Sequence, residues 1–124
     1  MILVDTCIWI EFLKAKEPVF SKLKRLLEDG SVLAFEPIFA ELLQGARDNR
    51  ERKIIMDYWE NLPKADTEKI LVRAGLESSK SGWLSKGVGL IDAAIIIHCR
   101  DTKSSLWTVD RKLLSVADNK NLFD

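Results

Sequence analysis

Two acidic residues of this 124-residue chain follow short apolar runs, at points that a parallel sheet would bring together. Asp5 directly follows the run at residues 2–4, and Asp110 follows a second run at residues 106–109. Ligands of open α/β sheets bind outside the carboxyl ends of the strands, so both carboxylates are expected at the functional edge. Each also has a simpler interpretation, since Asp5 suits the cap of a following helix and Asp110 suits a turn that opens the last helix.

Two further acidic residues lie in segments with a helical pattern that can reach the same edge. Glu41 falls at the border of the apolar face of its predicted helix, and Gly45 leaves open space one turn further on. Glu36 is a rival that spacing alone does not exclude. Asp92 lies near the start of a nearly all-apolar helix, where the helix dipole stabilises a negative charge. A solvated glutamate and an ordinary first-turn aspartate are the simpler interpretations of these two residues.

The chemistry of such a group follows from its ligand atoms. Asp5, Glu41, Asp92 and Asp110 offer only carboxylate oxygens, which Mg²⁺ and Mn²⁺ prefer and zinc does not. Carboxylates gathered at one point repel each other, and a divalent cation offsets that repulsion. A cation held in this way activates water and neutralises charge on a transferring phosphoryl group. The four acids therefore predict a Mg²⁺ or Mn²⁺ site that hydrolyses phosphodiester bonds.

Other catalytic arrangements find little support in the residue types present. His98 is the only histidine, and it lies about 240° around its helix from Asp92, so we interpret it as a structural or surface residue. A Ser-His-Asp or Cys-His site cannot be built convincingly around it. The loop at residues 87–89 lacks the spacing of a phosphate-binding loop. Cys7 and Cys99 match no zinc spacing and are expected to be buried free thiols.

The composition fits a single domain over residues 1–124, with 47% hydrophobic and 31% charged residues. The 19 basic and 19 acidic side chains give a formal net charge of zero, which argues against nucleic-acid binding through a large uniform basic field. Asp5 interrupts the N-terminal apolar stretch, so no signal peptide is expected, and no apolar stretch is long enough to span a membrane. We therefore expect a cytoplasmic protein with no membrane partner.

Short apolar runs alternate with amphipathic segments along the chain, which is the pattern of an α/β fold. The runs predict parallel strands at residues 1–4, 32–35 and 106–109, with a candidate edge strand at 121–123. Periodicity, caps and prolines predict helices at residues 7–14, 18–29, 37–46, 49–62, 67–85, 90–102 and 111–117. Residues 65–67 fit a brief strand or a turn equally well. The predicted fold is a single α/β domain with a central parallel sheet flanked by helices.

Three segments of the chain resemble the PIN-domain nucleases, and most closely the VapC-type toxins of prokaryotic toxin–antitoxin modules. The matching segments are ILVDTCIWIEFL, AELLQGARDNRE and LIDAAIIIHCRDTKSSLWTVDRKLLSVA. Each motif alone is weak, but the three occur in the family's order and together span most of the chain. The resemblance implies a PIN-like domain with a central parallel sheet and helices on both sides.

The resemblance also implies roles for single residues. The implied metal ligands and catalytic residues are, in chain order, Asp5, Glu41, Asp92 and the more variable Asp110. This decides the rivalry with Glu36 in favour of Glu41. Thr6 and Thr108 match small polar positions beside the family's site, where they orient waters or carboxylates. The implied cofactor is Mg²⁺, with Mn²⁺ as a substitute.

The activity implied by the resemblance is metal-dependent cleavage of RNA by the toxin of a type II toxin–antitoxin module. The implied partners are an RNA substrate, a cognate antitoxin protein that covers the site, and a second copy of the chain in a homodimer. A catalytically idle PIN-like interaction module is the alternative, and the intact acids argue against it. A receiver-type signalling module needs adjacent acids after its first strand and a lysine after its last, which this sequence does not supply.

An RNA substrate must be held by local basic side chains, because the net charge is zero. The main candidates are Arg47 and Arg50, which follow the predicted Glu41 helix, and Arg111, which is adjacent to Asp110. Further candidates are Arg52, Lys53, Lys80, Lys86 and Lys112. Each of these is also an ordinary solvated residue of a helix face.

One predicted helix carries an apolar stripe with several large side chains. The stripe consists of Ile54, Ile55, Tyr58, Trp59 and Leu62, and Trp9 and Phe12 add to it near the start of the chain. Most of these residues are expected in the core. Any that stay exposed would serve a dimer face or an antitoxin groove, because aromatic anchors are enriched in interfaces.

Overall fold

A computed structural model describes residues 1–123 of the chain. Its centre is a parallel sheet with the strand order β2-β1-β3, formed by β1 (Ile2–Val4), β2 (Val32–Leu33) and β3 (Ser105–Trp107). The middle strand β1 buries Leu3 and Val4, as expected of a strand covered on both faces. Because all three strands run in one direction, their carboxyl ends meet at a single edge of the sheet.

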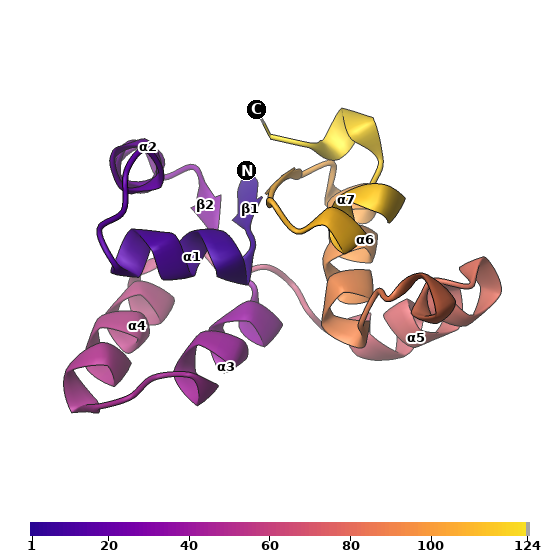
Figure 1. The fold of residues 1–124 in the computed structure, drawn as a ribbon, viewed down its shortest axis with the longest axis horizontal. Coiled ribbons are helices and arrows are strands. Elements are labelled where there is room, and N and C mark those ends of the chain that lie inside the picture. Colours follow the sequence, from indigo (N-terminus) through magenta and orange to yellow (C-terminus); the bar gives the residue numbers. More distant parts are fainter. Residues whose placement is uncertain (124) are drawn as a thin grey trace.

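Within residues 1–123, seven α-helices surround this sheet in two groups that follow one another along the chain (Figure 1). The first group is α1 (Thr6–Leu13), α2 (Val19–Glu28), α3 (Glu36–Gln44) and α4 (Asn49–Asn61). The second group is α5 (Ile70–Ser81), α6 (Leu90–Thr102) and α7 (Arg111–Val116), with short 3₁₀ helices η1 (Leu84–Lys86) and η2 (Asn119–Asn121) after α5 and α7. In the figure the first group lies on the left and the second on the right, with the strands between them.

Helix α6 is the most buried helix of the domain. Its residues from Ala93 to Cys99 are all buried, because the segment is apolar on nearly every side. His98 lies in this stretch against the ring of Phe35, with 5.3 Å between ring centroids, and burial lowers its pKa. The structural interpretation of His98 is therefore confirmed. No helix within residues 1–123 is both long enough and apolar enough to cross a membrane.

The aromatic residues form a cluster between α1, α3 and α4. The ring of Trp9 lies 5.3 to 5.8 Å from the rings of Phe12, Phe39 and Tyr58, mostly in edge-on or tilted arrangements, which aromatic pairs favour. Trp9, Phe12 and Ile55 are buried, whereas Ile54 is 37% exposed. The predicted stripe is thus mainly core, as expected, and its exposed edge borders a groove described below.

The structure confirms the α/β class and the helix at residues 90–102, and it shortens other predicted elements. The predicted strand at 32–35 ends at Leu33, because the chain turns into α3 soon afterwards. The predicted helix at 67–85 is limited to α5, since Lys69 and Gly82 adopt left-handed backbone conformations at φ 59° and 68°. The edge strand at 121–123 was wrong: η2 and one isolated bridge, from Leu122 to Leu106, take its place. Residues 65–67 have no regular structure.

Candidate functional site

Asp5 is the most deeply buried of the four predicted acids, with 6% of its surface exposed. Its backbone is fixed by the sheet, because its N–H donates to the Trp107 carbonyl at 2.9 Å. Its Oδ1 accepts the backbone N–H of Thr6 at 2.8 Å and caps α1. Its Oδ2 accepts the hydroxyl of Thr108 at 2.6 Å. Asp5 is therefore a helix cap and, at the same time, a rigidly held carboxylate at the carboxyl edge of the sheet.

Thr108 and Asp110 extend this arrangement beyond the end of β3. The buried Thr108 hydroxyl donates to Asp5 and accepts the backbone N–H of Asp110 at 3.0 Å. Asp110 uses Oδ1 to accept the N–H groups of Lys112 and Leu113 at 2.9 and 3.1 Å, and so caps α7. One threonine hydroxyl thus joins the Asp5 carboxylate to the backbone of Asp110. The capping interpretation of Asp110 is correct, and its exposed position leaves it open to solvent.

Glu41 is brought to Asp5 by the start of helix α1. The Thr6 hydroxyl donates to Glu41 Oε1 at 2.9 Å, across 35 residues of sequence. Thr6 therefore contacts Asp5 through its backbone N–H and Glu41 through its hydroxyl, and Thr108 contacts Asp5 through its hydroxyl. Glu36, the rival of Glu41, is exposed in the first turn of α3 and lines a shallower depression with Phe39 and Trp59.

Asp92 lies in the first turn of α6 and is partly buried. Its pKa is raised to about 6, first by burial and then by the negative charges of Asp5, Asp110 and Glu41. Three acids from three other segments of the chain therefore act electrostatically on Asp92. The effect is that expected when carboxylates share a poorly solvated place without a neutralising partner.

The donor atoms of this edge fit a hard divalent cation in type and charge. Every charged group acting on Asp92 is a carboxylate, and Thr6 and Thr108 add neutral hydroxyl oxygens close by. Among residues 1–123, however, no three acidic, histidine or cysteine side chains stand together closely enough to hold a metal ion. Binding a cation here would therefore require the exposed acids Glu41 and Asp110 to move inward, with a change in the Thr6 bond to Glu41 and in the helix cap at Asp110.

Cys7 lies beside Asp5, a contact that the sequence analysis did not predict. It was expected to be buried, but it is partly exposed, unlike Cys99. Its thiol donates to Asp5 Oδ2 at 3.6 Å and lies 3.9 Å from the Thr108 hydroxyl. Burial is the largest cause of its raised pKa. The usable signal was its place two residues after Asp5, where the first turn of α1 folds back over its own cap.

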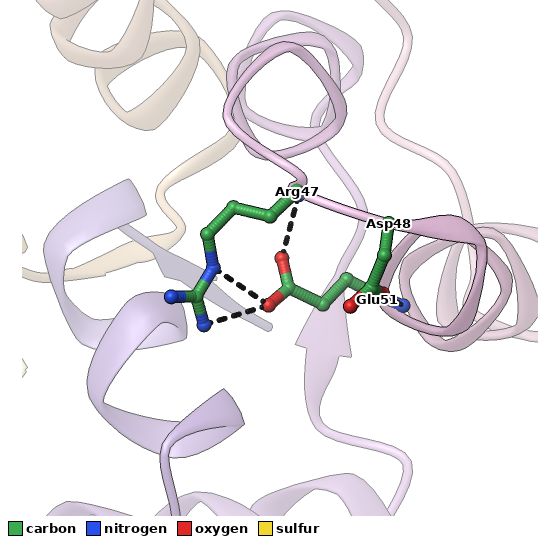
Figure 2. Close-up of polar contacts among 3 residues, drawn as sticks. All are labelled: Arg47, Asp48 and Glu51. Carbon is green, nitrogen blue, oxygen red and sulfur yellow. Dashed lines mark hydrogen bonds and ion pairs between the residues drawn. The ribbon is translucent and has the colours of Figure 1, made fainter.

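A groove of about 610 Å³ runs from Glu41 along α1, α3 and α4. Its apolar wall consists of Ile10, Leu13, Leu42, Ala46, Ile54 and Ile55. Arg47 and Glu51 border it: the backbone N–H and guanidinium of Arg47 donate to Glu51 at 2.8, 3.1 and 2.9 Å (Figure 2). These bonds lower the pKa of Glu51. Asp48 caps α4 beside them by accepting the Glu51 N–H at 2.9 Å.

The predicted RNA-contacting residues fall into two groups. Arg47 and Lys53 are paired along α4, with Glu51 and Asp57. Within the described part of the chain, Arg50 and Arg111 have no ion pair, and both are exposed. The Lys112 side chain covers the Gly87 backbone, because a Cβ added at Gly87 would meet Lys112 Cδ at 3.1 Å. Basic side chains thus flank the acidic edge on the α7 side, next to Asp110.

Comparison with known proteins identifies the family of the chain. The family model of the PIN domain matches residues 2–119. Ribonuclease VapC32 of Mycobacterium tuberculosis, from two strains, is 30% identical over 117 residues, covering 91% of this chain and 87% of that protein.

Two solved structures have the same fold at low sequence identity. A chain of VapBC2 from Rickettsia felis, crystallised with a DNA fragment from the promoter, superposes with a TM-score of 0.72 at 18% identity, covering 100% of this chain and 98% of that one. A chain of FitAcB from Neisseria gonorrhoeae superposes with a TM-score of 0.62 at 21% identity, covering 100% and 97%. The family model matches nearly the whole length, and a ribonuclease relative is 30% identical. The chain therefore belongs to the PIN-domain family and is similar to a VapC ribonuclease.

Proposed function

We propose that this protein is a Mg²⁺-dependent endoribonuclease and the toxin of a type II toxin–antitoxin module. The observation that carries the proposal is the raised pKa of Asp92, whose causes include all three of the other predicted acids. A helix cap or a solvated acid would not need three further carboxylates within electrostatic reach. The relative named a ribonuclease supports the choice of RNA as substrate.

In this proposal the acidic edge of the sheet is the catalytic centre. Asp5, Glu41, Asp92 and Asp110 hold Mg²⁺, or Mn²⁺ in its place, because their oxygens match the preference of these ions. The bound ion supplies an activated water and neutralises charge on the phosphoryl group. Thr108 and the Thr6 N–H hold Asp5 at a fixed orientation, and the Thr6 hydroxyl holds Glu41 toward it. A bound cation would favour the ionised form of Asp92, whose pKa is raised by burial and by its acidic neighbours.

The decisive experiment measures cleavage of a structured RNA by the wild type and by Asp5→Asn and Asp92→Asn, with Mg²⁺ and with excess EDTA. Loss of at least about 100-fold in rate is expected for each variant and on chelation, since electrostatic stabilisation of the transition state is removed. Glu28→Gln, on the far helix α2, is the matched control and should cleave at the wild-type rate. Undiminished cleavage in Asp5→Asn, or in EDTA, would refute the site assignment.

RNA is held, in this proposal, by Arg50, Arg111 and Lys112, with Arg47 joining after it leaves Glu51. An exposed ion pair such as Arg47–Glu51 is weak, so a phosphate competes with it readily. Each lost phosphate contact should reduce the salt dependence of RNA binding by about one unit. The measurement is RNA affinity at several salt concentrations for Arg50→Ala and Arg111→Ala, with Lys24→Ala on α2 as control. Unchanged slopes in both variants would exclude these contacts.

The cognate antitoxin is proposed to occupy the groove beside Glu41, through an apolar segment that carries a basic residue. The groove combines an apolar wall with the exposed Glu41 carboxylate at one end, and a cation placed there would block the site. Solved neighbours of this fold include a VapBC complex. Ile54→Glu should abolish inhibition by the cognate antitoxin, while RNA cleavage by the free toxin persists. Full inhibition of that variant would place the antitoxin elsewhere. The proposed place of action is the cytoplasm, where RNA and antitoxin are available.

A catalytically idle PIN-like module remains the second candidate for function. One observation favours it: no metal-ready group of side chains is assembled within residues 1–123. The two candidates differ in their response to metal, because an ion that binds only the folded state must raise the melting temperature. The nuclease proposal expects a concentration-dependent rise with Mn²⁺ that Asp92→Asn reduces and Glu28→Gln keeps. Absence of both the rise and any RNA cleavage would favour the idle module.

A further inference from the structure

The side chain of Lys112 lies at the acidic edge of the sheet without pairing with an acid. Lys112 is in the first turn of α7, where its backbone N–H donates to Asp110 Oδ1 at 2.9 Å. Its side chain is exposed, and within residues 1–123 its ammonium group forms no ion pair. A lysine that served to neutralise the acids would contact one of them. The Lys112 cation is instead available to an anion from outside the domain.

Gly87 provides the surface against which this lysine side chain lies. A Cβ added at Gly87 would stand 3.1, 3.3 and 3.4 Å from Lys112 Cδ, Cε and Nζ, so another residue there would push the end of the lysine aside. Gly87 follows η1 in a left-handed conformation, at φ 82°, which glycine adopts without steric cost. The absence of a side chain at position 87 therefore fixes where the ammonium group lies.

This contact joins the two segments that carry Asp92 and Asp110. Gly87 belongs to the loop that leads into α6, and Asp92 is in the first turn of that helix. Lys112 follows Asp110, the cap of α7. The charges that act on Asp92 are nevertheless all carboxylates, whereas a cation in close contact would lower its pKa. The ammonium group therefore lies at the border of the acids and not among them.

A cation at this border suits a phosphate that neighbours the cleaved one. In the proposed function the scissile phosphate lies at the ion held by the acids, and the strand continues on both sides with one negative charge per nucleotide. An ammonium group among the acids would meet the scissile phosphate, whereas one at their border meets the next phosphate along the strand. Such a contact fixes the register of the strand and carries no sequence information.

We propose that Lys112, seated against Gly87, binds the phosphate next to the cleaved one and so holds the scissile bond of the RNA at the acids. The ligand of this subsite is a strand with at least two consecutive phosphates. Lys112 is a substrate-binding residue, and Gly87 is a positioning residue that acts through it. The inference rests on the proposed function and deepens it, because it separates the phosphate that is cleaved from the phosphate that is held.

The first test uses a short RNA that the wild type cleaves, with an uncharged methylphosphonate in place of one phosphate on either side of the cleaved bond. The wild type should cleave one of these two RNAs about tenfold more slowly than the unmodified RNA, because a positioning contact is lost. Lys112→Ala should cleave the unmodified RNA about tenfold more slowly and should not respond to that replacement. Lys112→Arg keeps the charge and should restore the response. Equal responses of the wild type and Lys112→Ala, or no response of the wild type, would overturn the inference.

Gly87→Ala tests the seat of the lysine. It should slow cleavage of the unmodified RNA about threefold, because the new Cβ displaces the ammonium group, and it should have no further effect in Lys112→Ala. Gly30→Ala is the matched control: Gly30 has φ 69° and nothing within 4 Å of an added Cβ, so the backbone strain is the same and no side chain moves. Circular dichroism melting checks that each variant is folded. An equal loss from Gly87→Ala with and without Lys112 would overturn the role of Gly87.

A binding measurement separates this inference from the proposed function. The affinity of the same RNA is measured in EDTA, at several salt concentrations, by fluorescence anisotropy. Lys112→Ala should reduce the salt dependence by roughly 0.7–0.9, the contribution of one phosphate, whereas Lys24→Ala on α2 should not change it. An unchanged slope in Lys112→Ala would overturn the inference even if the wild type cleaves RNA. A reduced slope together with a wild type that cleaves no RNA would support the phosphate contact and remove the proposed function.

Discussion

Asp5 and Asp92 act on each other across one edge of the sheet, but their carboxylates are held in different ways. Asp5 is buried and accepts hydrogen bonds from the Thr6 backbone, the Thr108 hydroxyl and the Cys7 thiol. Asp92 accepts none from the residues for which contacts are described, and burial together with three acidic neighbours raises its pKa. One acidic cluster therefore contains two kinds of carboxylate. The hydrogen bonds of Asp5 stabilise the fold, whereas the charge of Asp92 destabilises it.

The largest effect is expected at Asp5. Asp5→Ala removes the cap of α1 and leaves the buried Thr108 hydroxyl without its acceptor, so the free energy of unfolding should fall by about 2–3 kcal/mol. Urea denaturation in EDTA at pH 7 measures this. Glu28→Ala, on the exposed surface of α2, should change it by less than about 0.5 kcal/mol. Stability equal to that of the wild type would mean that Asp5 is not held as described, and that repulsion among the acids dominates at this position.

A smaller loss is expected when the donor is removed and the acid is kept. Thr108→Val preserves the side-chain shape but removes the hydroxyl donor to Asp5 Oδ2, which keeps only the Cys7 thiol, and leaves the Asp110 N–H without its acceptor. This should cost about 1–2 kcal/mol. The same urea experiment measures it. Thr102→Val, which removes a more exposed hydroxyl at the end of α6, serves as control and should cost less. A larger effect at Thr102 than at Thr108 would contradict the central position given to the Asp5–Thr108 bond.

Substitution of Asp92 should raise the free energy of unfolding, whereas substitution of Asp5 or Thr108 should lower it. An aspartate whose pKa rises from 3.8 in the unfolded chain to about 6 in the fold binds its proton more tightly when folded. Stability therefore falls as pH rises between these two values and stays reduced above pH 6. Asp92→Asn removes this penalty, so the metal-free variant should be more stable than the wild type by about 1 kcal/mol at pH 7, after allowance for solvent screening at a half-buried group.

The pH dependence isolates this effect from other titrations. The stability difference between Asp92→Asn and the wild type should be small near pH 4 and should grow toward pH 6.5. His98 has a lowered pKa and destabilises the fold as pH falls, but it is present in both proteins and cancels in the difference. A divalent cation should reduce the difference, because it neutralises the charge that Asn removes. If Asp92→Asn is less stable than the wild type at pH 7, Asp92 stabilises the start of α6 as an ordinary first-turn aspartate.

The sequence predicted the parts of this edge that depend on strand ends and helix starts. Asp5 and Asp110 follow strands, and the rule that ligands bind at carboxyl ends is enough to place them. Helix α6 was predicted to its exact bounds, because length outweighed the β preference of its isoleucine triplet. The contact of the Cys7 thiol with Asp5 was missed, although Cys7 lies two residues after Asp5, because the contact depends on how the first turn of α1 closes. The pairing of Arg47 with Glu51 was missed too, because it requires the turn that precedes α4.

The sequence did not reveal the exposed apolar side of α5, for a different reason. Its leucines and valine read as an ordinary apolar face, and periodicity does not tell which apolar residues meet the core and which meet solvent. Only the position of α6 against Ile70 and Ala74 separates them. The predicted helix also extended past Ser81, because nothing local marked Gly82 as a left-handed end. Exposed apolar surface is a property of the assembled domain, so it has to be read from the structure.

The smallest effect on stability, and the sharpest test of the contrast between held and tolerated acids, is expected at Thr6. Its hydroxyl bond to Glu41 is exposed, unlike the buried bond from Thr108, so Thr6→Val should change the free energy of unfolding by less than about 0.5 kcal/mol. Its backbone N–H still donates to the capping carboxylate of Asp5 in the variant. Cleavage of RNA should nevertheless slow by about tenfold and need more Mg²⁺, because Glu41 loses its orientation toward Asp5. Thr6→Ser keeps the hydroxyl and should restore both. If Thr6→Val cleaves RNA at the normal rate and at the normal Mg²⁺ concentration, Glu41 needs no positioning by Thr6. If Thr6→Val loses as much stability as Thr108→Val, the Thr6 hydroxyl stabilises the fold and is not specific to catalysis.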